Sequence, residues 1–79
     1  MPRYFIDSSD GARSERDDTG LDLDDDAAAR IAALDALPDM VREALPDGDE
    51  RIFSVHVRSS DGTDLYHAEM TLVGKWLKP

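Results

Sequence analysis

The sequence predicts a small two-layer α+β domain, ordered β-β-α-β-β, in which one kinked helix packs on a mostly antiparallel sheet. Three observations support this fold class. Residues 52–72 contain two runs that alternate between apolar and polar side chains, residues 24–45 have helical spacing, and the tetrapeptide Ser-Ser-Asp-Gly occurs at 8–11 and again at 59–62. A chain of 79 residues has material for one thin core, so we expect a single domain over residues 1–79.

The first strand is expected over residues 3–8, where Tyr4, Phe5 and Ile6 supply the apolar content. Each Asp-Gly pair predicts a two-residue hairpin loop of type I′, because both central positions of that turn need positive φ. The return over residues 12–18 is almost wholly polar and predicts an edge strand or a loop. Residues 21–23 alternate and predict a short stretch beneath the helix.

The helix is expected to begin at one of three consecutive aspartates, residues 24–26, each of which can cap the first free amides. Pro38 predicts a kink or a break after Leu37, because proline cannot donate to the preceding turn. The helix should end near Leu45, before the turn-forming residues 46–49. The predicted core consists of Ile31, Leu34, Val41 and Leu45 against Phe53, Val55, Val57, Tyr66, Ala68 and Met70.

The last hairpin has a predicted register. If Asp61 and Gly62 form a two-residue loop, Ser60 faces Thr63 and the alternation of the two strands fixes every later pair. The core-facing pairs are then Val57 with Tyr66, Val55 with Ala68 and Phe53 with Met70. The other face pairs Arg58 with Leu65, His56 with His67, Ser54 with Glu69 and Ile52 with Thr71.

Charge narrows the choice of partners. The formal net charge is −9, and half of the 18 acidic residues lie between Asp7 and Asp26. Such a chain repels phosphate backbones and anionic lipid, so we expect no nucleic acid and no membrane partner. The absence of cysteine and of any signal-peptide pattern in the first ten residues favours a cytoplasmic protein.

Two histidines form the most specific local feature. His56 and His67 are predicted as a cross-strand pair on an exposed face, and Glu69, diagonal to His56, offers a third metal ligand. Two neutral surface histidines are the simpler interpretation, so we assign no metal site and keep His56, His67 and Glu69 as metal candidates. Trp76 is expected to close the core, with a partner anchor as the alternative.

No pattern of catalysis or cofactor binding stands out. The serines cluster in turns without a strand-to-helix elbow, and Asp22 to Asp26 lacks the glycine and the terminal glutamate of a calcium loop. The five glycines are scattered rather than gathered in a phosphate loop. We therefore predict that the protein is not an enzyme and holds no cofactor.

Several segments in order resemble a family of small, acidic, standalone bacterial proteins of unknown function. They are the opening residues 1–5, the Asp-Gly turns at 10–11 and 61–62, the segment 17–21, and Leu-Pro-Asp-Gly at 45–48. The resemblance spans nearly the whole chain and implies a standalone protein. It carries no assigned activity and no functional residue to transfer.

The leading hypothesis is a non-catalytic interaction module that uses an exposed strand face or edge to bind another protein or a second copy of itself as a homodimer. Two alternatives remain. One is a metal-binding or metal-responsive protein that uses the histidine pair, and the other is an acidic decoy that occupies a nucleic-acid-binding protein.

Overall fold

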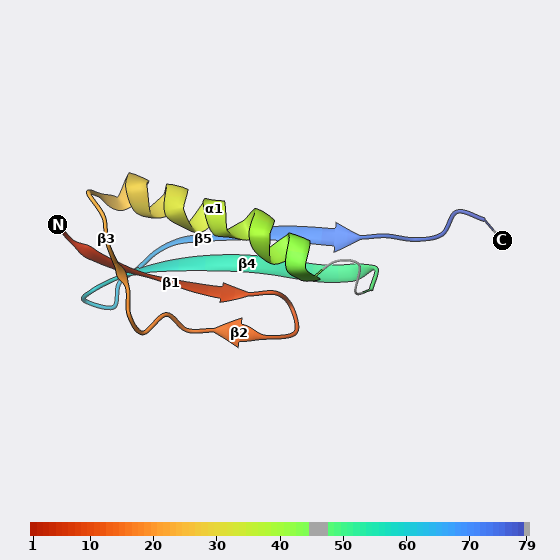
Figure 1. The fold of residues 1–79 in the computed structure, drawn as a ribbon, viewed down its shortest axis with the longest axis horizontal. Coiled ribbons are helices and arrows are strands. Elements are labelled where there is room, and N and C mark those ends of the chain that lie inside the picture. The colour runs from red at the N-terminus through yellow and green to blue at the C-terminus, as the bar shows by residue number, and fades with distance from the viewer. Residues whose placement is uncertain (45–47, 79) are drawn as a thin grey trace.

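The computed structural model describes residues 1–44 and 48–78 (Figure 1). Its elements, in chain order, are β1 (Arg3–Ser9), β2 (Ser14–Glu15), β3 (Leu21–Asp22), α1 (Asp26–Ala44), β4 (Glu50–Ser59) and β5 (Asp64–Val73). One helix therefore lies on one antiparallel sheet, which confirms the predicted α+β class. No helix within these ranges is both long enough and apolar enough to cross a lipid bilayer.

The sheet has the order β2-β1-β4-β5, and β3 also pairs with β1. β1 and β4 lie side by side although the helix separates them in the chain, with Ile6 opposite Val57 and Asp7 opposite His56. The two short strands lie on the outer side of β1, where Ser8 faces Glu15 and Tyr4 faces Leu21. The polar segment 12–18 is thus an edge strand of two residues followed by a loop.

The core lies between α1 and the inner face of β1 and β4. Its fully buried residues are Tyr4, Ala29, Ala33, Leu37, Phe53, Val55 and Val57. On the helix these are spaced four residues apart, and the two alanines let the helix axis approach the large strand side chains.

The helical half of the predicted core is partly wrong. Ile31 is 57% exposed, because it lies on the side of α1 that faces away from the alanine stripe. Met70 on β5 is also exposed, at 47%, because α1 lies mainly over β4 and covers β5 less fully. Leu34, Val41, Tyr66 and Ala68 pack against the core in partly buried positions, and Leu45 lies outside the described residues.

The predicted start of the helix and the effect of Pro38 can be compared with the structure, whereas the predicted end near Leu45 lies outside the described residues. Asp25 caps the helix, since its Oδ1 accepts the Ala28 amide at 2.9 Å. The Tyr4 hydroxyl donates to Asp26 at 2.7 Å and ties β1 to the first turn, which raises the pKa of Tyr4 to about 12. α1 continues through Pro38, so the predicted break is wrong; this proline is exposed, and the loss of its amide is tolerated on the solvent side. A kink at Pro38 stays a prediction.

The register of the last hairpin is confirmed over most of its length. Val57 faces Tyr66, Val55 faces Ala68, Phe53 faces Met70, His56 faces His67, Ser54 faces Glu69 and Ile52 faces Thr71.

The predicted two-residue loop is wrong. Ser59 pairs with Thr63 around a three-residue loop, and a register shift after Val57 places Arg58 opposite Asp64 rather than Leu65. Only glycines have positive φ among the described residues, so neither aspartate takes the conformation that type I′ requires. Gly62, at φ +87°, instead supplies the single left-handed residue of a three-residue loop.

The residues after β5 contradict the prediction that Trp76 closes the core. Gly74 still donates to the Asp49 carbonyl at 2.6 Å, after which the chain leaves the body of the protein (Figure 1). Trp76 is 80% exposed and Leu77 88%, so Trp76 does not close the core. The ammonium of Lys78 lies over the Trp76 ring, 5.1 Å from its centre.

Candidate functional site

The sheet face opposite α1, which we call the open face, carries the polar positions of the strands. Because Phe53, Val55 and Val57 point into the core, the residues between them point the other way. Asp7, His56 and His67 therefore form one row across β1, β4 and β5 on this face.

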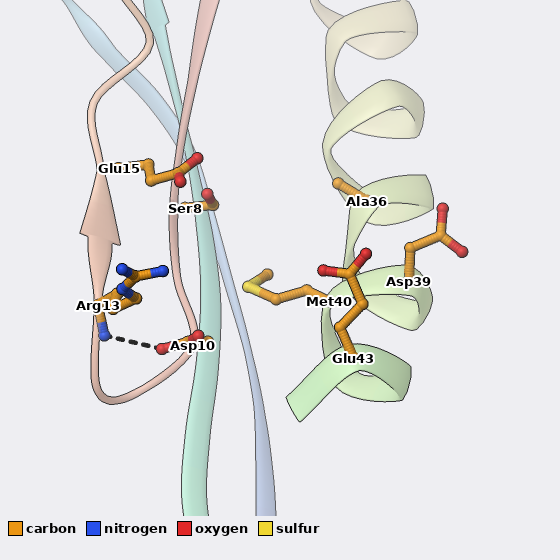
Figure 2. Close-up of a pocket in the computed structure, with 8 residues that line it drawn as sticks. All are labelled: Ser8, Asp10, Arg13, Glu15, Ala36, Asp39, Met40 and Glu43. Carbon is orange, nitrogen blue, oxygen red and sulfur yellow. Dashed lines mark hydrogen bonds between the residues drawn. The ribbon is translucent and has the colours of Figure 1, made fainter. Parts of the chain in front are cut away.

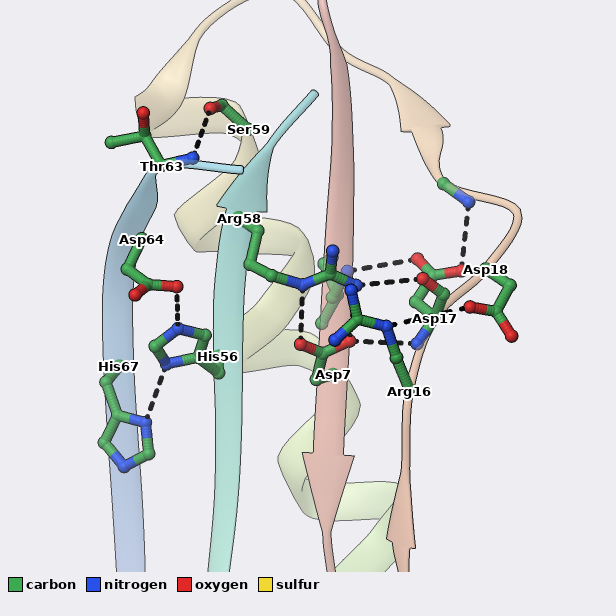
Figure 3. Close-up of polar contacts among 12 residues, drawn as sticks. Asp7, Arg16, Asp17, Asp18, His56, Arg58, Ser59, Thr63, Asp64 and His67 are labelled. Atoms are coloured by element: carbon green, nitrogen blue, oxygen red, sulfur yellow. Dashed lines mark hydrogen bonds and ion pairs between the residues drawn. The ribbon is translucent and has the colours of Figure 1, made fainter. Parts of the chain in front are cut away.

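The structure brings the two predicted histidines together. Their Nδ1 atoms lie 3.2 Å apart, and the ring centres lie 5.4 Å apart (Figure 3). Each remaining nitrogen has a carboxylate partner: His56 Nε2 lies 2.8 Å from Asp64, and His67 Nε2 lies 3.1 Å from Glu69. A carboxylate accepts, so each Nε2 can donate to its carboxylate, and the two Nδ1 atoms face each other within hydrogen-bonding distance.

Glu69, the third metal candidate from the sequence, does not stand beside both histidines. It binds the nitrogen of His67 that faces away from His56, which makes it a partner of the ring rather than a ligand shared by the pair. Asp64 was not singled out from the sequence, because the two-residue loop placed Leu65 rather than Asp64 opposite Arg58.

A second polar cluster on the same face joins β1, β4 and the loop after β2. Arg58 donates to both carboxylate oxygens of Asp7, at 2.8 and 2.9 Å, and to the Asp17 carbonyl at 3.0 Å (Figure 3). Asp7 also accepts the Asp17 amide at 2.9 Å. The Arg58 guanidinium, which also lies over the Phe5 ring, lowers the pKa of Asp7, and Asp7 in turn raises the pKa of Arg58.

Between β2 and β3, the side chain of Asp17 takes the place of a strand partner on the outer side of β1. Its carboxylate accepts the amides of Gly20 at 2.9 Å, Ile6 at 3.0 Å and Thr19 at 3.0 Å. Burial alone would raise the pKa of this carboxyl, but the three amides outweigh it and the pKa is lowered. β2, Asp17 and β3 together cover the outer side of β1, which we call the covered edge.

The other side of the sheet has a different character. In the part of the chain that the structure describes, no strand pairs with the outer side of β5, and we call that side the free edge. Because Gly74 donates to Asp49 and pairs alternate along an antiparallel ladder, the outward amides on β5 belong to His67, Glu69, Thr71 and Val73. β5 is ten residues long, so this side of it presents a row of backbone groups to solvent.

A small apolar pocket adjoins this free edge. It has a volume of about 120 Å³ and is lined by Val41 from α1, Phe53 from β4, and Met70, Thr71 and Leu72 from β5. Its position beside exposed Met70 gives the free edge an apolar side toward the helix.

An acidic groove lies on the opposite flank, between α1 and the first hairpin (Figure 2). It has a volume of about 290 Å³, with Asp10 and Glu15 on the sheet side, Asp39 and Glu43 on the helix side, and Met40 between them. Arg51 reaches across from β4 and donates to the Asp10 carbonyl at 2.6 Å, which anchors the first turn. Arg13 also lines the groove, Arg42 pairs with Asp39 at 3.1 Å and Arg51 lies 3.6 Å from the Asp10 carboxylate, so these cations offset part of its negative charge.

A family model described as "Domain of unknown function (DUF6894)" matches residues 3–71. The chain belongs to this family. The matched residues of the DUF6894 domain begin with β1 and end within β5. No curated protein and no solved structure matches the chain. The predicted membership of an uncharacterised family is therefore confirmed, while a bacterial origin stays a prediction.

Proposed function

We propose that this DUF6894 domain is a small, non-catalytic interaction module that binds an extended segment of another protein along the free edge of β5. The contrast between the outer side of β1 and the outer side of β5 carries the proposal. The chain uses two short strands and an aspartate to occupy the backbone groups of β1, yet leaves a ten-residue strand open on the other side. An open edge of this length is a template for strand addition.

The surroundings of the free edge define the chemistry of the partner. Side chains of an added strand alternate between the two faces of the sheet. Those on the helix side would meet Met70 and the apolar pocket beside it, and those on the open face would meet Glu69. With a net charge of −9 on the domain, the fitting partner is an extended segment that alternates apolar and basic residues.

A nucleic-acid-binding protein is one class of partner that offers such basic segments, which keeps the acidic decoy within the same proposal. A second copy of the chain is the competing occupant, since two β5 strands can pair about a two-fold axis. Mutual repulsion of two acidic domains weakens that pairing at low salt, whereas attraction to a basic partner strengthens there.

The experiment blocks the free edge without touching the ladder. Thr71→Pro removes an outward amide and adds a ring on the solvent side of an edge strand, a position where proline is tolerated. Thr71→Val is the matched control, because it keeps the amide and the β-branched shape. Circular dichroism of both variants checks that each folds.

Tagged wild-type protein and both variants are then used to capture partners at low and high salt. We expect a stoichiometric partner with wild type and Thr71→Val, lost with Thr71→Pro and weakened by salt, and we expect its binding to shift the backbone resonances of Glu69 and Thr71. A partner retained by Thr71→Pro would contradict the proposal. A dimer abolished by Thr71→Pro, seen by analytical ultracentrifugation, would assign the edge to a second copy instead.

A further inference from the structure

We propose that His56 and His67 form a binding site for one divalent transition-metal ion, in which Asp64 and Glu69 orient the two rings. The site lies on the open face and uses the ring nitrogens of the two histidines, whereas strand addition uses the backbone groups of β5.

The spacing of the two facing nitrogens suits a single metal ion. Zinc binds imidazole nitrogen at about 2.0 to 2.1 Å, so two ligands at right-angled to tetrahedral geometry stand about 2.9 to 3.4 Å apart. The two Nδ1 atoms are 3.2 Å apart. His56 and His67 are a directly opposed pair whose side chains are 33% and 46% exposed, so a small rotation of each ring can direct both lone pairs at one ion.

The carboxylates distinguish this arrangement from two histidines that happen to be neighbours. A histidine that ligates a metal commonly donates its other ring N–H to a carboxylate, which fixes the tautomer and makes the ligating nitrogen more basic. Here both rings have that partner: Asp64 on His56 at 2.8 Å and Glu69 on His67 at 3.1 Å. The two negative charges also favour a dication between the rings.

The protein supplies two ligands, and water completes the coordination. Among the described residues no group of three histidine, aspartate or glutamate side chains can hold one metal, and the neighbouring Asp7 carboxylate is occupied by Arg58 and the Asp17 amide. An imidazole pair suits zinc, nickel and copper, of which copper binds most tightly in general. The ion class is therefore a borderline transition-metal dication rather than calcium or magnesium.

The test uses zinc chloride and the full chain. Isothermal titration gives the stoichiometry and the dissociation constant, and NMR of the imidazole protons shows which rings respond. We expect one zinc per chain, shifts of both histidine rings, and loss of measurable binding in His56→Ala and in His67→Ala. In the double variant Asp64→Asn, Glu69→Gln we expect affinity to fall at least about tenfold.

Ser54→Ala, on the same face of β4, is the matched control and should bind as wild type. Circular dichroism checks that each variant folds. The proposal is overturned if zinc moves neither ring, if binding survives the loss of either histidine, or if the double carboxylate variant binds as tightly as wild type.

Discussion

The outer sides of β1 and β5 are treated very differently. β1 is overlaid along its length by β2, the Asp17 carboxylate and β3, and Arg58 and Asp7 fasten that cover to β4. β5 is as long as β4 and turns its outer amides to solvent. Residues 10–23 cover one edge of the sheet while the other stays open, and this difference is the reason for the contact proposed at β5.

The largest expected effect comes from opening the covered edge. Asp17→Ala leaves the amides of Ile6, Thr19 and Gly20 without their acceptor, and we expect the free energy of unfolding to fall by about 3 kcal/mol. Urea denaturation followed by circular dichroism measures it. Asp18→Ala, an exposed neighbour whose only described ion pair is to Arg16 at 3.8 Å, should change stability by less than about 0.5 kcal/mol. Equal losses in the two variants would show that Asp17 does not hold the cover in place.

Two glycines sharpen the same comparison. Gly20, in the loop of the covered edge, has φ +78°, and an added Cβ would lie 3.0 Å from the Tyr4 carbonyl oxygen of β1. Gly62, in the turn that leads to β5, has φ +87° but open space around it. We expect Gly20→Ala to cost about 2 to 3 kcal/mol, from backbone strain and overpacking, and Gly62→Ala about 1 kcal/mol from strain alone. Denaturation of the two variants under one set of conditions tests this; a larger loss at Gly62 would refute the tight fit of the cover.

Acid should weaken the covered edge. Arg58 lowers the pKa of Asp7 and backbone amides lower that of Asp17, both from an ordinary value of 3.8. A lowered folded-state pKa means that the stabilisation is complete above about pH 4 and is lost as the pH falls through the folded values. Stability measured from pH 6 to pH 2 should fall at the acid end, and it should fall less in Asp17→Ala. An unchanged acid limb in that variant would assign the loss to other carboxyl groups.

The smallest predicted effect is a difference in hydrogen-exchange rate between single backbone amides, and it involves no change in stability. The Ile6 amide is held by Asp17, whereas those of Glu69 and Thr71 point to solvent, so hydrogen exchange at Ile6 should be at least about tenfold slower. Adding a strand at β5 should slow Glu69 and Thr71 without changing Ile6. Slow exchange at Thr71 in the isolated protein would indicate that the free edge is already paired.

The sequence was most informative where pattern and pairing are local. The alternation of the last hairpin determines which residues of β4 and β5 face each other, including His56 and His67, since a one-residue slip would expose the whole apolar set. The predicted loop was one residue too short, because Asp-Gly also suits a three-residue loop with glycine alone in the left-handed region. That shift brings Asp64 level with Arg58 at the end of the ladder.

The pairing of strands that are far apart in the chain could not be predicted from the local sequence pattern. Nothing local states that β1 pairs with β4, so the Asp7 and Arg58 pair, 51 residues apart in the chain, could not be derived. The helix shows a further limit. Hydrophobicity favoured Ile31 for the core, whereas close packing favoured the small side chains of Ala29 and Ala33, which let the helix axis approach β4.

The exposed tail gives the protein a fluorophore of its own. Trp76 is the single tryptophan, it is already exposed to water, and it lies three residues after the end of β5. Unfolding should therefore alter its emission little, whereas a strand laid along β5 and onto the tail would move the indole out of water and shift the emission to the blue. One intrinsic signal would then report association separately from denaturation, without a dye on this small chain.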